Sequence, residues 1–254
     1  MASALTLRSD LPGSVANPPE IKAVCLDVDD TLVDFTRSAR AALFALIGRD
    51  DMWPAWQRVT DEFVARAVAG ELDPQTMREH RTKAFFAEQL GIQLDDGTVA
   101  VLEARRLAQM CHSWRLFPDA LRCLDWLRAA GLKVAAVTNA SGPQQHTKIA
   151  AMGLTRYFDV VVIAGEVGVA KPDPRIFHAA CQRLQVQPHQ AVHIGDRLDL
   201  DAVGARDAGL HAIWLNRDPA FHVAPPARVH TITDLDDLPE LLVWEYAGVP
   251  APRR

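Results

Sequence analysis

Three carboxylates and a hydroxyl follow directly on a short apolar run near the start of the chain. The run is Ala23 to Leu26, and the polar residues are Asp27, Asp29, Asp30 and Thr31. Such a run, closed by polar residues, is typical of a buried parallel strand whose carboxyl end opens into a site. Residues two apart on a strand point to one face, so we expect Asp27 and Asp29 to lie together. Carboxylates that close repel each other unless a cation or a shared proton lies between them, which indicates chemistry.

Polar residues also follow three later apolar runs. They are Thr138 and Asn139, Lys171 within V-A-K-P, and Asp196 after Gly195, with Asp199 and Asp201 close behind. Each has an ordinary structural interpretation by itself, as a strand exit, a surface lysine or a turn. In an open parallel sheet, however, ligands bind outside the carboxyl ends of the strands. Four loops delivering polar groups to that edge together favour a functional site.

The elements that must position these residues fall into two groups. Residues 35–116 show helical patterns without a convincing strand, with helices expected over 39–47, 52–69, 74–90 and 97–114. The rest alternates short β-branched runs with helices. Strands are expected at 132–137, 160–164, 191–194, 211–215 and 229–232, and helices at 119–130, 143–152, 174–184, 198–208 and 234–244.

This alternation predicts an α/β protein with a doubly wound, Rossmann-like parallel sheet and right-handed connections. The first strand belongs to that sheet, because alone it could not cover both of its faces. We therefore expect a core of residues 21–33 and 116–244, with a helical module of residues 34–115 inserted after the first strand. Residues 1–20 are expected to be a flexible arm and residues 245–254 a flexible tail.

Composition narrows the function classes. The chain has 254 residues, is 49% hydrophobic and carries a net charge of -5, which does not suggest a nucleic-acid partner. No apolar run approaches the roughly 18 residues of a membrane span, and the N-terminal segment does not resemble a secretory signal. The four cysteines show no C-x-x-C pairing, which is typical of reduced thiols in a cytoplasmic protein.

The polar motifs, taken together, resemble those of the haloacid dehalogenase-like (HAD) hydrolase superfamily. D-V-D-D-T-L is similar to its first motif, V-T-N to its second, the lysine of V-A-K-P to its third, and G-D-R-L-D-L-D to its fourth. The helical insert is similar to the helical cap of that family, so the resemblance covers about residues 21–242. It implies a phosphatase that uses Mg²⁺ and acts on a small phosphorylated metabolite, as a monomer or a homodimer.

The resemblance implies a role for each motif residue. Asp27 would be the nucleophile that forms an aspartyl-phosphate, and Asp29 would be the general acid and base. Mg²⁺ would bind Asp27, Asp196 and the backbone carbonyl of Asp29. Asp201 would support these ligands from outside, with Asp199 as a weaker candidate.

The remaining motif residues would handle the phosphoryl group. Thr138 and Asn139 would bind it near a helix start, and Lys171 would neutralise charge on both the nucleophile and the phosphoryl group. Many family members have glycine where Asp30 stands, and we expect Asp30 to form the turn. Arg197 and Leu200 also depart from frequent family residues, without removing a metal ligand.

Several alternatives stay open. A phosphomutase would use the same residues, and a catalytically silent HAD-fold binding protein is a rival of another class. A dehalogenase fits less well, because displacing a halide needs no acid at Asp29. Leu32 to Phe35 would form the hinge to the cap, and no role is assigned to His189 or His193. The candidate substrate contacts in the cap are Trp53, Trp56, Arg78, His80 and Arg81, although tryptophans pack between helices more often and such charges more often lie on a solvated face.

Overall fold

Six parallel strands form a single sheet in the computed structural model, which describes residues 18–68, 70–140, 142–218, 220 and 223–250. The sheet order is β3-β2-β1-β4-β5-β6, so the first strand lies in the middle. The strands are β1 (Ala23–Leu26), β2 (Lys133–Thr138), β3 (Val160–Ile163), β4 (Ala191–Gly195), β5 (His211–Leu215) and β6 (Val229–Ile232). This confirms the predicted α/β, Rossmann-like core.

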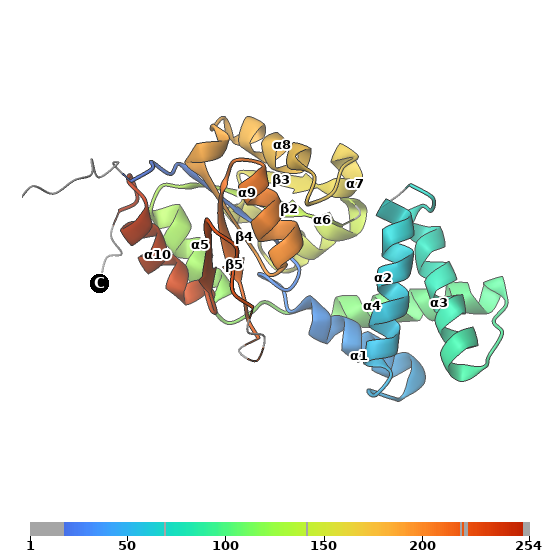
Figure 1. The fold of residues 1–254 in the computed structure, drawn as a ribbon. Helices are drawn as coiled ribbons and strands as arrows, with labels where there is room; N and C mark the ends of the chain where they lie inside the picture. Colours follow the sequence, from blue (N-terminus) through green and yellow to red (C-terminus); the bar gives the residue numbers. More distant parts are fainter. Residues whose placement is uncertain (1–17, 69, 141, 219, 221–222, 251–254) are drawn as a thin grey trace, which may run out of the picture.

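Both faces of the sheet are covered by helices, which explains the continuous apolar character of its strands. On one face, Val24 and Leu26 pack in a core with residues of α5 (Ala120–Ala129), α6 (Gly142–Ala151) and α10 (Leu238–Glu245). On the other face, Ala23 and Cys25 pack with α8 (Pro174–Leu184) and α9 (Gly204–Asp207). Figure 1 shows α8 and α9 on one side of the sheet, and α5 and α10 on the other.

The register of the central strands brings their carboxyl ends together. Leu26, the last residue of β1, is paired with Ala136 of β2 and with Ile194 of β4. Asp27, Thr138 and Asp196 follow within two residues of these pairs, so they emerge at the same edge of the sheet.

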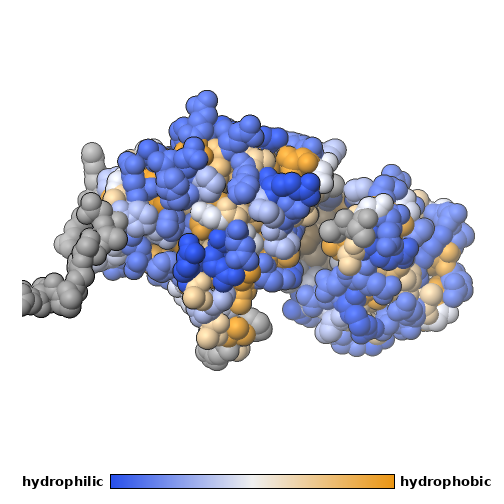
Figure 2. All heavy atoms as spheres, turned by 45° about the horizontal axis from the view of Figure 1, so that its top comes forward, coloured by the Kyte–Doolittle hydropathy of each residue, from blue (hydrophilic) through white to orange (hydrophobic). Residues whose placement is uncertain are grey.

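A separate helical module lies to one side of the sheet (Figure 1). It consists of α1 (Phe35–Ile47), α2 (Trp53–Val68), α3 (Pro74–Leu90) and α4 (Asp96–His112). Its own apolar core contains Leu43, Trp56, Phe63, Phe85 and Phe86. The face drawn in Figure 2 is mostly hydrophilic over both the sheet unit and the module, with only scattered apolar residues.

Two adjacent linkers join the helical module to the sheet unit. Val33 forms an antiparallel bridge with Leu116, and Phe117 N donates to Leu32 O at 2.9 Å. The Asp34 carboxylate accepts from the Arg115 guanidinium at 2.9 Å. The segment expected to be a hinge therefore runs beside the returning chain.

Some predicted boundaries differ from the structure. The first helix begins at Phe35 and not at residue 39, because Asp34 caps it by accepting from Arg37 N. The single helix expected over 198–208 is instead a π-helical segment, Leu198–Val203, followed by α9. The short helix α7 (Ala164–Val167) and the 3₁₀ segments at Thr155–Tyr157 and Pro188–Gln190 were not predicted, and the helix predicted over 234–244 begins with a 3₁₀ turn, Leu235–Asp237.

The two ends of the described chain meet. Ile21 N donates to Ala247 O at 3.1 Å, Ala247 N donates to Pro19 O at 2.9 Å, and Tyr246 is buried. The expected flexible arm and tail are therefore wrong at this point: Glu20 forms a bridge with Ala247, and Glu245 is the last residue of α10. Residues 1–17 and 251–254 of that expectation lie outside the described residues. No helix in the described ranges has the length and apolar character needed to cross a membrane.

Candidate active site

Lys171 connects two carboxylates at the carboxyl edge of the sheet. Its Nζ lies 2.5 Å from Asp27 Oδ1 and 2.7 Å from Asp201 Oδ1. All three side chains are buried. Burial alone would lower the pKa of Lys171, but Asp201 and Asp27 raise it above its usual range, so the ammonium keeps its proton. The structure thus brings together Asp27, Lys171 and Asp201, as the sequence predicts.

Asn139 holds the loop that delivers this lysine. Its Nδ2 donates to Lys171 O at 2.9 Å, and Lys171 N donates to Asn139 Oδ1 at 2.7 Å. Its side chain is therefore used on the protein backbone, which differs from the expected contact with a phosphoryl group. Thr138 is buried at the same edge, where its Oγ1 accepts from Gln145 Nε2 at 3.1 Å; a hydroxyl that accepts in this way can also donate its own proton to a ligand.

Asp201 is fixed from several directions. His193 Nε2 lies 2.9 Å from Asp201 Oδ1, and Arg197 N donates to Asp201 Oδ2 at 3.1 Å. A side chain at Gly195 would collide with the Asp201 carboxyl group, so only glycine permits this approach. His193, to which sequence analysis assigned no role, is thus a buried support of Asp201. The one sequence signal for this role was a polar histidine between Val192 and Ile194 in an otherwise apolar strand.

The cluster has an excess of carboxylates. One oxygen from each of Asp27, Asp196 and Asp201 lies within 4.8 Å of the others. Burial first, and then the neighbouring carboxylates, raise the pKa of Asp196 to about 8. Burial also raises the pKa of Asp27 to about 7, although Lys171 opposes this.

Asp201 behaves in the opposite way. Burial alone would raise its pKa, but Lys171 and His193 hold the pKa of Asp201 well below its usual range. Since Lys171 and the hydrogen bond with His193 stabilise the Asp201 carboxylate, Asp196, and Asp27, which shares Lys171 with Asp201, are the carboxylates that would gain most from a cation. Hard carboxylate oxygens are ligands that Mg²⁺ prefers, so the donor set fits that ion.

Asp29 has a partner that sequence analysis missed. Lys148 Nζ lies 2.6 Å from Asp29 Oδ1, and the lysine side chain is only 3% exposed. Lys148 is on α6, which follows the second motif directly. The signal that could have found it is the pairing of Gln145 and Lys148 three residues apart, which places two polar side chains on the inward face of this helix.

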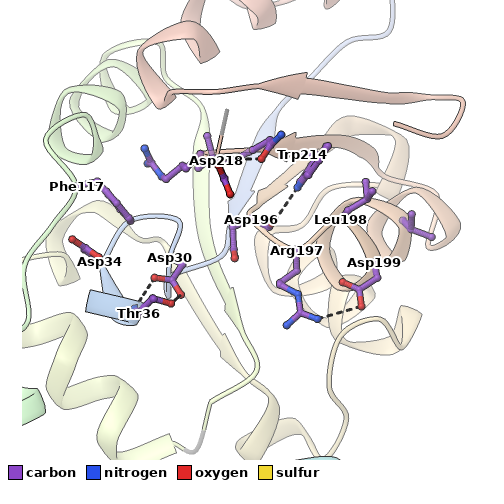
Figure 3. Close-up of a pocket in the computed structure, with 14 residues that line it drawn as sticks. Asp30, Asp34, Thr36, Phe117, Asp196, Arg197, Leu198, Asp199, Trp214 and Asp218 are labelled. Atoms are coloured by element: carbon purple, nitrogen blue, oxygen red, sulfur yellow. Dashed lines mark hydrogen bonds and ion pairs between the residues drawn. The ribbon is translucent and has the colours of Figure 1, made fainter. Parts of the chain in front are cut away.

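Asp30 forms the turn after β1, as predicted. Its backbone has φ of 59°, in the left-handed region, and its N–H donates to Val33 O at 2.7 Å. Its carboxylate accepts from Thr36 N at 2.8 Å and from Thr36 Oγ1 at 2.7 Å. Asp30 therefore ties the turn to the start of α1, and Figure 3 shows this contact.

Asp199 does not support the cluster. Its carboxylate pairs with the Arg197 guanidinium at 3.4 Å, and both side chains are largely exposed. Figure 3 shows the pair beside Asp196, and all three residues line one cavity. This cavity has a volume of about 900 Å³, and a smaller one of about 210 Å³ is lined by Asp27, Asp29, Lys171 and Asp196, among others.

Two of the five candidate contacts in the helical module lie in its interior. Trp56 and Arg81 are buried, and the Arg81 guanidinium lies 4.3 Å from the centre of the Trp56 ring. Arg81 Nη2 also donates to Glu103 Oε1 at 3.1 Å. The expectation that Arg81 lies on a solvated face is therefore wrong, since Glu103 compensates its charge inside the module. Arg78 is half-buried and His80 exposed.

Comparison with known proteins finds similar sequences among hydrolases. The family model for haloacid dehalogenase-like hydrolases matches residues 21–209. A glyceraldehyde 3-phosphate phosphatase of Methanopyrus kandleri is 32% identical over 209 residues, which cover 78% of this chain and 84% of the relative. A phosphoserine phosphatase of Thermus thermophilus is 38% identical over 128 residues, covering 49% and 51%.

Solved structures share the fold. The magnesium-bound structure of YfnB of Bacillus subtilis superposes with a TM-score of 0.74 at 23% identity, covering 88% of this chain and 99% of that one. L-2-haloacid dehalogenase of Xanthobacter autotrophicus superposes with a TM-score of 0.71 at 25% identity, covering 88% and 98%.

Proposed function

We propose, since the chain belongs to the haloacid dehalogenase-like hydrolase family, that it is a magnesium-dependent phosphatase acting on a small phosphorylated metabolite. The observation that carries this proposal is the contact of 2.5 Å between the buried Lys171 ammonium and Asp27, with a second carboxylate, Asp29, two residues further on. A nucleophile held beside a fixed positive charge, with an acid at hand, suits transfer of a phosphoryl group.

In the first step, an oxygen of Asp27 attacks phosphorus and the bond from phosphorus to the ester oxygen breaks. Asp29 gives its proton to that leaving oxygen, which departs as an alcohol. Lys171 stabilises the negative charge that is shared between Asp27 and the phosphoryl oxygens. Thr138, whose hydroxyl proton is available, donates to one of those oxygens.

In the second step, water attacks the aspartyl-phosphate. The Asp29 carboxylate takes a proton from the water, the bond between phosphorus and Asp27 breaks, and inorganic phosphate leaves. Asp27 returns as a carboxylate and Asp29 as an acid, so the cycle closes without another reactant.

Asp27 and Asp196 would hold Mg²⁺, because they are the two carboxylates of the cluster that Lys171 and His193 do not fully neutralise. The bound ion would neutralise these carboxylates and the phosphate group of the substrate. Asp201 would support the arrangement through its contacts with Lys171 and His193. The helical module would cover the site and select the substrate, in the manner of a cap.

Asp29 also favours phosphatase over dehalogenase chemistry. A halide leaves without a proton, whereas an alkoxide needs one, and Asp29 supplies it. A phosphomutase would use the same residues, but both relatives reported above are named as phosphatases. The names of the relatives also suggest phosphorylated metabolites of a few carbons as first substrates to test.

The test is release of inorganic phosphate from a panel of phosphorylated metabolites, with Mg²⁺ and with a chelator. We expect hydrolysis of at least one compound with Mg²⁺ only, and a loss of about 10³-fold or more in Asp27→Asn, because the nucleophile is removed. An Asp199→Asn variant is the matched control and should keep its activity. Isomerisation of a substrate without phosphate release would favour the phosphomutase, and undiminished hydrolysis by Asp27→Asn would overturn the proposal.

A further inference from the structure

Lys148 is a buried charge that the steps above do not use. It lies on α6 and is 2% exposed as a residue, and its Nζ contacts Asp29 Oδ1 at 2.6 Å. A lysine is almost never buried unless it is paired, because its ammonium loses hydration. The partner here is the residue that would carry the proton in both steps, so the position of Lys148 bears on the reaction.

Two aromatic rings complete the surroundings of this ammonium. Lys148 Nζ lies 4.7 Å from the centre of the Phe35 ring and 5.7 Å from that of the Trp114 ring. Both distances are within the range of cation–π attraction. Phe35 is the first residue of α1, and Trp114 follows α4, so the rings come from the two linkers of the helical module. Lys148 thus touches the turn after β1 and both linkers at once.

We propose that Lys148 is the positioning residue of Asp29, held in place by Phe35 and Trp114. The inference rests on the proposed phosphatase function and adds a residue to it. Lys148 occupies Oδ1 of Asp29, which fixes the carboxyl rotamer and leaves Oδ2 for the proton transfer. Among hydrogen bonds between described residues, the contact with Lys148 is the one that the Asp29 side chain makes.

The arrangement suits both halves of the reaction. Asp29 becomes a carboxylate when its proton passes to the leaving oxygen, and the neighbouring ammonium stabilises that charge. Asp29 then takes a proton from water in the same orientation. A misplacement of about 1 Å can lower the rate by on the order of 10²-fold. Fixing the Asp29 rotamer can therefore offset the cost of burying the Lys148 charge.

Direct binding of substrate by Lys148 is a different role, and it would raise KM when the lysine is removed. The ammonium already faces Asp29 and two rings, and it is almost without solvent contact. Positioning predicts instead an effect on kcat that depends on the presence of Asp29. The two roles therefore separate in steady-state kinetics.

The experiment compares Lys148→Met and Lys148→Arg with the wild type, with Lys133→Met as matched control. Lys133 is another lysine of the sheet unit, whose Nζ donates to Leu184 O at 2.6 Å at the opposite end of β2. With the best alkyl phosphate of the panel, we expect Lys148→Met to lower kcat by about 10- to 100-fold and to change KM less than about twofold. Lys148→Arg should keep at least about a third of kcat, because it restores the ion pair.

Nitrophenyl phosphate gives a second readout. Nitrophenolate leaves without a proton, so its release in the first turnover should fall less than about threefold in Lys148→Met. In an Asp29→Asn background, the Lys148→Met change should have no further effect on kcat, since a positioning residue cannot act without the group it positions. Phe35→Leu keeps both Lys148 and Asp29. We expect it to lower kcat by about three- to tenfold and to change KM little, as Lys148→Met does to a larger extent. If Lys148→Met does not fold, the proposal is tested with Phe35→Leu instead.

The proposal would be overturned by a loss of kcat that persists in the Asp29→Asn background, by a raised KM at unchanged kcat, or by unchanged kinetics of Lys148→Met. These outcomes are distinct from a failure of the proposed function. That failure would show as a wild-type protein that releases no phosphate from any compound of the panel, nitrophenyl phosphate included.

Discussion

At the scale of single residues, the site depends on how one ammonium is shared. Lys171 bonds Asp27 and Asp201, while Asp196 lies outside this contact. The pKa of Asp201 consequently lies below its usual range, whereas burial and repulsion raise that of Asp196 to about 8. One lysine thereby gives three similar carboxyl groups different surroundings: Asp201 and Asp27 contact the ammonium, and Asp196 does not.

Replacing Lys171 by Met should harm both activity and stability. Asp27 and Asp201 would remain buried without their common partner, so we expect a loss of about 3–5 kcal/mol in the free energy of unfolding. Activity should fall by at least about 10³-fold, because charge on the phosphoryl group is no longer neutralised. Denaturant titration and phosphate release measure the two effects.

Lys22→Met is the control for this substitution, since Lys22 forms an exposed pair with Glu20. Such a pair contributes little to stability. If Lys171→Met kept the stability and the activity of Lys22→Met, the role given to the Lys171 ammonium would be wrong.

At the scale of elements, the end of β4 is shaped by one missing side chain. A methyl group at Gly195 would meet the Asp201 carboxyl group, which is itself fixed by His193. Gly195→Ala should therefore displace Asp201, with a loss of about 1–3 kcal/mol in unfolding free energy and a lower kcat. Gly97→Ala, on α4, meets only Asp95 Oδ1 at 3.3 Å and is the matched control. Equal stability of the two variants would contradict this account of Gly195.

The helical module is held together by a buried ion pair network. Glu103 accepts from Arg81 at 3.1 Å and from Arg106 at 2.8 Å. Burial alone would raise the pKa of Glu103, but the two arginines keep it below its usual value. Glu103→Gln leaves two buried guanidinium groups without a counter-charge, so we expect a loss of about 3–5 kcal/mol in stability. Asp50→Asn, which removes the exposed partner of Arg40, should cost less than about 1 kcal/mol.

The sign of the pH effect follows from the direction of that shift. A carboxyl group whose pKa is lowered by folding stabilises the protein above its ordinary pKa, near 4, and this contribution is lost as the pH falls. Thermal unfolding at decreasing pH should therefore show a steeper loss in the wild type than in Glu103→Gln. Parallel curves would show that the Glu103 carboxylate does not stabilise the module.

The elements could be predicted where their patterns are local. The pairing of Asp73 as N-cap with Pro74 fixed the start of α3, and apolar runs of four to six residues located the strands. The edge of the sheet at which Asp27, Lys171 and Asp196 meet followed from the rule for parallel sheets. Family resemblance then assigned their roles.

The rest could not be predicted because it depends on distant contacts. Lys148 and Asp29 are 119 positions apart, so no local pattern links them. The inward direction of Arg81 depends on Glu103 of another helix. The π-helical turn at Leu198–Val203 places Asp201 toward Lys171, and a periodic pattern does not distinguish it from an ordinary helix.

At the scale of the whole molecule, two units meet at two linkers (Figure 1). The residues that line the smaller cavity, Asp27, Lys171 and Asp196 among them, belong to the sheet unit. Asp34 and Arg115, one from each linker, form an ion pair. The contacts of Lys148 with Phe35 and Trp114 connect Asp29, the proposed acid, to the same linkers. Movement of the helical module would thereby reach Asp29, which suits a site that closes over its substrate.

The stability of the whole protein should depend on metal and pH together. Folding raises the pKa of Asp27 to about 7 and that of Asp196 to about 8, so the folded state binds protons more strongly there. Without metal, the unfolding free energy should fall as the pH rises from about 4 to about 8. Mg²⁺ should reduce that fall and raise the melting temperature, because it replaces the protons.

Asp196→Asn is the matched variant for this measurement. It removes one repelling carboxylate, so we expect a flatter pH dependence and a smaller effect of Mg²⁺ on the melting temperature. The measurement is the melting temperature of the wild type and of Asp196→Asn with Mg²⁺ and with a chelator, at several pH values. If the stability of the wild type rose over this pH window and its melting temperature did not change with Mg²⁺, the cation site would be contradicted.

The central claim is the covalent role of Asp27, and trapping tests it most directly. The protein is mixed with its best phosphorylated substrate and Mg²⁺, quenched, and treated with borohydride, which reduces an acyl phosphate to an alcohol. Mass spectrometry of the peptide that contains residue 27 then reports the product. We predict homoserine at position 27 in the wild type and none in Asp27→Asn. Turnover with an unmodified Asp27, or reduction at another carboxylate, would contradict the mechanism.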